Sequence, residues 1–331
     1  MHISKRFLLN ISFILLLLLM FLYPIPTIKG ASSGLLLWFN TVLPNLLPFI
    51  IVSNIIMKLN ITDYICRFFR PLFKRIFNVS QNGCYPIIIG LMSGYPLGGK
   101  TSSDMVALNK ISKSEGQYLL ALCNNASITY IINYIGITTL KVPSLQYVML
   151  GIIYLSSFLS SIICNRIFHL QWDPSLHNDM EDLKPKKEKK PFNFRETIDN
   201  SIMNGFEVIT KIGGYIMLFS VISHILIIAS QMDHLNLSPL LLTIINYLKL
   251  LVIGTLEITT GTYFIGAANI TFQAKFLLIM AITAFGGMSS LAQTYSVLNH
   301  SNLSIKIYIK TKIMNAIIAS IISYCYLLIF F

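Results

Sequence analysis

Long apolar runs separated by short polar or charged segments form the main pattern of this chain. A bilayer-spanning helix needs about 20 apolar residues. We expect apolar helices at 7–23, 34–57, 115–136, 142–168, 205–228, 238–253, 276–297 and 313–331. Only 11% of the 331 residues are charged and 54% are hydrophobic, whereas about a quarter of an average soluble protein is charged. The pattern predicts an all-α polytopic membrane protein.

Four of the apolar stretches are interrupted by glycine, proline or polar residues. The interruptions lie at 93–100, 123–127, 254–261 and 285–290. In hydrocarbon, irregular backbone is tolerated only where its polar groups find partners in protein or in a water-filled cavity. We therefore predict re-entrant helical hairpins near 93–100 and 254–261, and broken helices at the other two interruptions.

The basic residues orient these helices. Lysines and arginines gather in cytoplasmic segments of membrane proteins. The assignment that best satisfies this rule leaves only Lys29, Lys141, Lys249 and Lys275 outside, and it counts Lys306, Lys310 and Lys312 among the cytoplasmic charges. It places the N-terminus and the charged segment 169–200 in the cytoplasm.

This orientation makes the span near Gly34 and its counterpart near Gly205 cross the membrane in opposite directions. We predict an N-terminal transmembrane helix at 1–33, a first repeat at 34–168, a charged linker with an amphipathic start at 169–200 and a second, inverted repeat at 201–331. Paired interruptions in inverted halves are the sequence pointer to the midplane binding site of a secondary transporter.

Two further segments near the N-terminus have their own character. The basic start and apolar core of 1–26 fit either a signal peptide or a retained first helix, and the missing small-residue cleavage motif favours the helix. Residues 61–77 mix Arg67, Arg70, Lys74 and Arg75 with phenylalanines, which is typical of a helix lying on an anionic membrane surface.

The interruption from Gly94 to Thr101 matches the nucleotide-binding pattern G-x-x-x-x-G-K-[ST]. A phosphate-binding loop of that kind joins a buried strand to a helix in a soluble α/β domain, and no other part of this chain predicts the rest of a parallel sheet. The interpretation we favour is a hairpin tip whose free N–H groups at a helix N-terminus hold an anion.

Two charged residues stand out at the interruptions. Lys100 either pairs with a bound anion or forms an ion pair with Asp104, and the sequence does not separate these roles. Glu257 lies in an apolar segment, where an acidic residue indicates function by default. It carries a coupling proton, holds a donor group of the substrate, or serves as a hydrogen-bonded structural residue.

Polar groups and glycines at the same interruptions complete the predicted substrate site. Interhelical hydrogen bonding is the alternative role for each of the polar ones. These residues are Ser93, Gly94, Tyr95, Gly98, Gly99, Asn124, Asn125, Ser127, Thr259, Thr260, Gly286, Gly287 and Ser289.

Other classes of function lack support in the sequence. There is no H-E-x-x-H, G-x-S-x-G or comparable catalytic pattern, so we do not expect an enzyme. The five scattered cysteines form no metal or disulfide pattern, and we expect them to be small buried apolar residues. The net charge of +12 is spread over loops rather than gathered on a polar domain that would bind nucleic acid. We expect no cofactor.

The segments Ser93–Lys100 and Cys123–Ser127, followed by 254–261 and 284–289, resemble the YlbJ family of sporulation integral membrane proteins. That family, also called stage V sporulation protein V, carries a nucleoside recognition or gate domain. The resemblance covers most of the chain from about Gly34. It implies transport of dipicolinic acid across the outer forespore membrane of the mother cell, and kinship with concentrative nucleoside transporters.

We therefore expect a transporter of a small organic anion, dipicolinate, with a midplane site between inverted repeats. Its expected partners are this anion, the lipid bilayer and a coupling proton or cation, and an oligomer is left open. Two alternatives remain at this stage: a nucleoside or nucleobase transporter, in which Glu257 and Asn125 bond the ribose or base edges, and a sporulation scaffold without transport.

Overall fold

A computed structural model describes residues 5–168, 193–229, 238–298 and 301–330. The described residues are overwhelmingly helical, as the apolar pattern predicts. Six of the helical segments are long and apolar enough to cross a membrane, namely 24–58, 143–167, 194–228, 239–256, 272–297 and 305–330. The chain is an all-α polytopic membrane protein.

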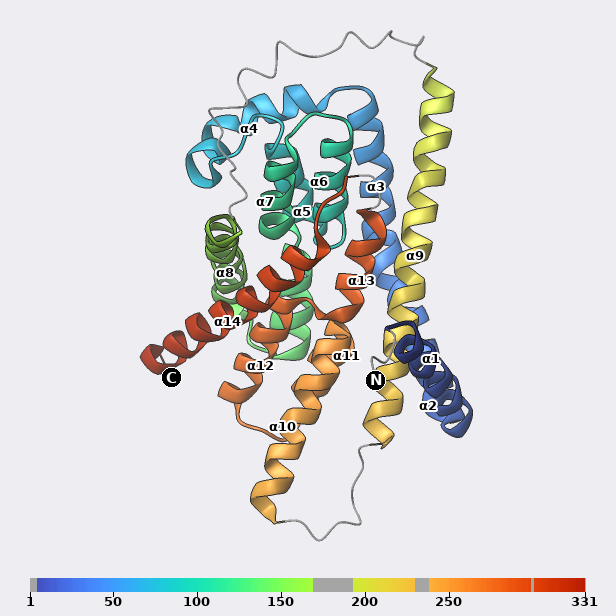
Figure 1. The fold of residues 1–331 in the computed structure, drawn as a ribbon. Coiled ribbons are helices and arrows are strands. Elements are labelled where there is room, and N and C mark those ends of the chain that lie inside the picture. The colour runs from blue at the N-terminus through green and yellow to red at the C-terminus, as the bar shows by residue number, and fades with distance from the viewer. Residues whose placement is uncertain (1–4, 169–192, 230–237, 299–300, 331) are drawn as a thin grey trace.

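The first part of the chain forms a long apolar rod and a surface helix. Helix α1 (Lys5–Leu22) comes first. Helix α2 (Pro24–Leu37), the π-helix η1 (Trp38–Val42) and α3 (Leu43–Lys58) then form one candidate span, 24–58. Helix α4 (Thr62–Phe77) then lies across the end of the bundle at which α3 finishes (Figure 1). The apolar helix expected at 34–57 thus lies within a longer continuous span and contains a π-helical turn.

The interruption at 93–100 is the tip of a helical hairpin. Helix α5 (Cys84–Ser93) enters from the α4 end of the bundle, the chain reverses at Gly94–Pro96, and α6 (Leu97–Ala107) returns beside it (Figure 1). Helix α7 (Lys113–Cys123) follows, ends in a break at 124–127, and the chain continues into the π-helix η2 (Tyr130–Thr139). The chain then passes through the short η3 (Pro143–Leu145) into the spanning helix α8 (Gln146–Ile167).

The second half also contains a hairpin and a broken helix. Helix α9 (Phe194–Ala229) packs along α2 and α3. Helices α10 (Pro239–Leu256) and α11 (Ile258–Ala267) form a second hairpin, whose close contact is made between Gly254 and Gly261. Helices α12 (Phe272–Phe285) and α13 (Gly287–Val297) form a span broken at Gly286, and α14 (Ile305–Phe330) closes the chain.

The two hairpins occupy opposite ends of the bundle: α5 and α6 lie in the upper half of Figure 1, while α10 rises from the bottom. This placement agrees with inverted halves, although the inverted repeat itself stays a prediction. Most of the predicted linker, 169–192, lies outside the described residues, and α9 already begins at Phe194, inside the predicted linker boundary of 200.

One expectation about the cysteines is wrong. Cys66, Cys84, Cys123 and Cys164 are buried, as expected, but Cys325 is exposed. Cys325 lies on the outer face of α14, near the end of the chain, where an apolar side chain faces hydrocarbon at no cost.

Gly94 fixes the first hairpin tip, because its backbone has φ +73° and ψ −160°, a region that is essentially restricted to glycine. A Cβ at this position would lie 2.6 Å from Ser127 N and 2.9 Å from Asn125 O. We expect Gly94→Ala to destabilise the protein by more than the roughly 1–3 kcal/mol of the backbone strain alone. The measurement is the melting temperature of purified protein in detergent.

Gly151→Ala is the matched control for that variant. Gly151 lies inside α8 with no atom near its would-be Cβ, so alanine should leave the melting temperature unchanged or raise it. Equal effects of the two substitutions would show that the tip does not depend on Gly94.

Candidate functional site

The four predicted interruptions meet at one place in the bundle. Tyr95 N at the first hairpin tip donates to Asn125 O in the α7–η2 break, at 2.7 Å. The ring of Tyr95 lies against Gly286 of the α12–α13 break. Gly287 in turn abuts Ile258 N at the second hairpin tip, 3.2 Å from its would-be Cβ. We call this meeting place the central site.

Asn124 ties three elements together and is completely buried. Its Oδ1 accepts from Gly99 N at 3.1 Å, and its Nδ2 donates to Thr294 Oγ1 at 2.9 Å and to Tyr308 Oη at 2.7 Å. These bonds join the first hairpin to α13 and α14. Asn124 therefore fills the role of interhelical hydrogen bonding that the sequence left open.

Asn125 faces a charge. Its Nδ2 donates to Leu122 O at 2.7 Å and Ser157 Oγ at 2.8 Å, and its Oδ1 accepts from Lys312 Nζ at 2.9 Å. Lys312 Nζ also donates to Asn124 O at 3.3 Å. The α7–η2 break thus presents oxygen atoms to a lysine of α14.

The predicted location of Lys312 is wrong. The charge assignment placed it with Lys306 and Lys310 in the cytoplasm, whereas the structure buries it completely inside the bundle. Its Nζ lies 5.8 Å from the ring centre of Tyr95 and 6.0 Å from that of Tyr308. Among the described residues no carboxylate forms an ion pair with it. The central site therefore holds a lysine amine whose partners, among the described residues, are all uncharged.

The spacing of polar residues along the sequence could have revealed that Lys312 is buried. Tyr308, Thr311, Lys312 and Asn315 recur at intervals of three and four residues, and all are buried. Such spacing puts them on one face of a helix, and polar side chains on one face of an otherwise apolar span turn toward the bundle interior.

Glu257 caps the second hairpin tip. It is 3% exposed, and its two carboxylate oxygens accept from Thr259 N at 3.1 Å and Thr260 N at 2.6 Å. A carboxylate at this position also suits the positive end of the α11 dipole. These bonds match the structural role among the three that the sequence allowed, and they use the backbone N–H groups of both threonines.

The N–H groups at the first hairpin tip are also engaged. Leu97 N donates to Gly94 O at 3.0 Å, Gly98 N to the same oxygen at 3.2 Å, and Gly99 N to Asn124. In this conformation they are not available to an anion, and among the described residues of the central site Lys312 is the basic donor.

Some polar groups around the central site have no partner within the described residues. They are Tyr95 Oη and Ser93 Oγ in the first hairpin, Thr283 Oγ1 in α12 and Asn315 Oδ1 in α14. Since buried polar groups normally have a hydrogen-bond partner, these four are candidates to contact a substrate. The rest of the predicted set lies at the breaks but bonds locally: Ser127 Oγ contacts Thr129, and Ser289 Oγ accepts from Gln293.

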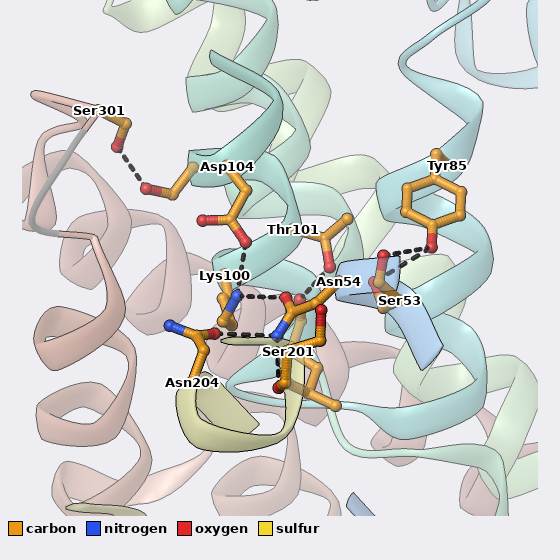
Figure 2. Close-up of polar contacts among 11 residues, drawn as sticks. Ser53, Asn54, Tyr85, Lys100, Thr101, Asp104, Ser201, Asn204 and Ser301 are labelled. Carbon is orange, nitrogen blue, oxygen red and sulfur yellow. Dashed lines mark hydrogen bonds and ion pairs between the residues drawn. The ribbon is translucent and has the colours of Figure 1, made fainter. Parts of the chain in front are cut away.

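Lys100 lies apart from this group. Its Nζ forms an ion pair with Asp104 at 2.6 Å and donates to Asn54 Oδ1 of α3 at 3.1 Å. Asn54 Nδ2 continues to Asn204 Oδ1 of α9 at 2.9 Å, and Figure 2 shows the chain of contacts from α6 through α3 to α9. We call these four residues the polar seam. Lys100 thus takes the ion-pair role that the sequence left open.

We expect Asn54→Leu to destabilise the protein by about 1–3 kcal/mol, the range for a buried polar group left without its partner. The substitution removes the link between Lys100 and Asn204. Melting temperature in detergent measures the loss. Asn45→Leu is the control, because Asn45 is exposed on the same helix and donates only to Thr41 O of the preceding turn. Equal shifts for both would contradict a role for the polar seam.

Sequence comparison adds one relative. The chain is 24% identical over 316 residues to the sporulation integral membrane protein YlbJ of Bacillus subtilis (strain 168), which covers 90% of this chain and 77% of that protein. No protein-family model matches the chain, and no solved structure does. The similarity supports a membrane role in sporulation.

Proposed function

Because the chain belongs to the YlbJ family of sporulation integral membrane proteins, we propose that it transports dipicolinate across the outer forespore membrane. The observation that carries the proposal is Lys312, a buried amine without a carboxylate partner among the described residues, at the point where four helix breaks meet. A buried charge is costly unless it is paired, and a substrate anion supplies the pair.

The surroundings of Lys312 suit a planar aromatic dicarboxylate. One carboxylate binds the ammonium in a charge-assisted hydrogen bond, while the rings of Tyr95 and Tyr308 offer faces to a pyridine. Tyr95 Oη, which has no partner within the described residues, supplies a further hydrogen-bond donor.

The helix breaks supply the means of moving such a substrate. Discontinuous helices that meet at the midplane mark the binding sites of secondary transporters, in which one part of the protein rocks against the other. In this proposal the hairpins and breaks move with the substrate, and α2, α3 and α9 form the stationary part.

Flux into vesicles tests the proposal. Purified protein reconstituted in liposomes should accumulate labelled dipicolinate above protein-free vesicles, and unlabelled dipicolinate should compete while nucleosides should not. Nucleoside flux instead would favour the carrier in which Asn125 and Glu257 bond ribose or base. No flux of either compound by folded protein would indicate a scaffold. In cells, spores of a deletion strain should contain less dipicolinate.

A further inference from the structure

Helix α4 presents three different faces. Cys66 and Phe73 are buried against the bundle, with Phe69 and Phe77 packed beside them. On one flank Tyr64, Phe68, Leu72 and Ile76 recur every fourth residue and are exposed, Phe68 to 80% and Tyr64 to 73%. The opposite flank carries Arg67, Arg70 and Lys74.

A pocket lies beside the basic residues of α4. Arg70, Pro71, Lys74, Arg75 and Asn78 line a shallow open pocket of about 510 Å³. Within the described part of the chain, Arg67, Lys74 and Arg75 form no ion pair with a carboxylate, and Arg70 makes one long hydrogen bond, 3.5 Å to Gln81 Oε1. The pocket therefore offers unneutralised guanidinium and ammonium groups to an anion.

From these two flanks we infer that α4 is a binding site for the phosphate headgroup of an anionic phospholipid. Arginine pairs with phosphate bidentately and lysine pairs with it as a point charge. The exposed aromatic and aliphatic row is an apolar surface for the acyl chains of the same lipid, as in helices that lie in the interface. Charge complementarity and the adjoining apolar row together select a lipid over a free ion.

The position of α4 fits this partner. It lies across the end of the bundle rather than along it (Figure 1), as a helix in the interfacial plane must. It also connects the spanning helix α3 to the first hairpin. A lipid held there binds beside the part of the protein proposed to move, although the lipid site itself does not depend on transport.

Titration of the purified full-length protein in neutral detergent tests the site. Phosphatidylglycerol, but not phosphatidylcholine, should bind and raise the melting temperature. Since each basic residue near an anionic surface changes affinity about fivefold, Arg67→Gln/Lys74→Gln/Arg75→Gln should weaken phosphatidylglycerol binding on the order of 100-fold. The control Lys29→Gln/Lys113→Gln/Lys306→Gln removes three exposed lysines elsewhere and should keep the affinity. Equal losses in the two triple variants would overturn the site.

A second variant separates a lipid from a free anion. Phe68→Ser/Leu72→Ser leaves every cation in place and alters only exposed side chains, so the fold should persist. It should weaken phosphatidylglycerol binding. Unchanged lipid binding in this variant, or inorganic phosphate that raises the melting temperature as strongly as the lipid, would show that the pocket holds free anions and would overturn the lipid assignment.

Discussion

Replacement of Lys312 by methionine is expected to abolish dipicolinate flux in a protein that still folds. Methionine fills nearly the same space without charge, so the bundle no longer has to bury an ammonium. The loss falls on the substrate: removing one member of a buried, hydrogen-bonded charge pair costs about 2–5 kcal/mol, which weakens binding at least about 30-fold. Equilibrium binding of labelled dipicolinate and flux into vesicles both measure this.

Lys310→Met is the matched control for this experiment. Lys310 lies two residues away on the same helix, is exposed, and contacts only the ring of Phe168 among the interactions described, so its loss should leave flux intact. Lys312→Arg keeps the charge and should retain more binding than Lys312→Met. Wild-type flux in folded Lys312→Met protein would exclude Lys312 as the anion partner.

The sequence alone predicts the helix breaks well because their cause is local. Gly94 and Gly286 adopt a positive φ that glycine allows, and Glu257 caps the N-terminus of α11, so each interruption of an apolar run has a local cause. The structure confirms a hairpin at 93–97 and another at 256–258. Which of these breaks contact one another depends on tertiary packing, which local sequence patterns do not predict.

Burial explains why Lys312 was missed. Two neighbouring lysines, Lys306 and Lys310, are exposed on the same helix, and a count of charges along the chain treats all three alike. The stripe of Tyr308, Lys312 and Asn315 separates them, because only one face of α14 turns inward. The position of each lysine around the helix, rather than the number of charges, distinguishes the buried lysine from the two exposed ones.

The sequence also could not predict whether the N–H groups at the first hairpin tip are free to bind an anion. A glycine-rich tip predicts unpaired donors at a helix N-terminus, but Gly99 N is bonded to Asn124 Oδ1 from another element. The same helix carries Lys100, whose side chain bonds Asn54 in α3. Adjacent residues of α6 therefore contact the central site on one side and the polar seam on the other, which couples the hairpin to both.

Glu257→Gln is expected to lower both stability and flux. The carboxylate caps two N–H groups with two oxygens, whereas an amide offers one oxygen and turns an NH₂ group toward the other donor. Leaving a buried donor unsatisfied costs about 1–3 kcal/mol, and the second hairpin tip should loosen. The melting temperature in detergent and initial flux rates measure the two effects.

Glu257→Asp distinguishes a capping role from a coupling role. Aspartate keeps the charge and is a strong helix cap, so a residue that only caps should tolerate it with near wild-type stability and flux. If Glu257 instead carries a coupling proton, Glu257→Gln protein that retains its melting temperature should lose the dependence of flux on an imposed pH gradient. A stable Glu257→Gln variant with unchanged, gradient-dependent flux would remove Glu257 from the site altogether, leaving Lys312 as its charged centre.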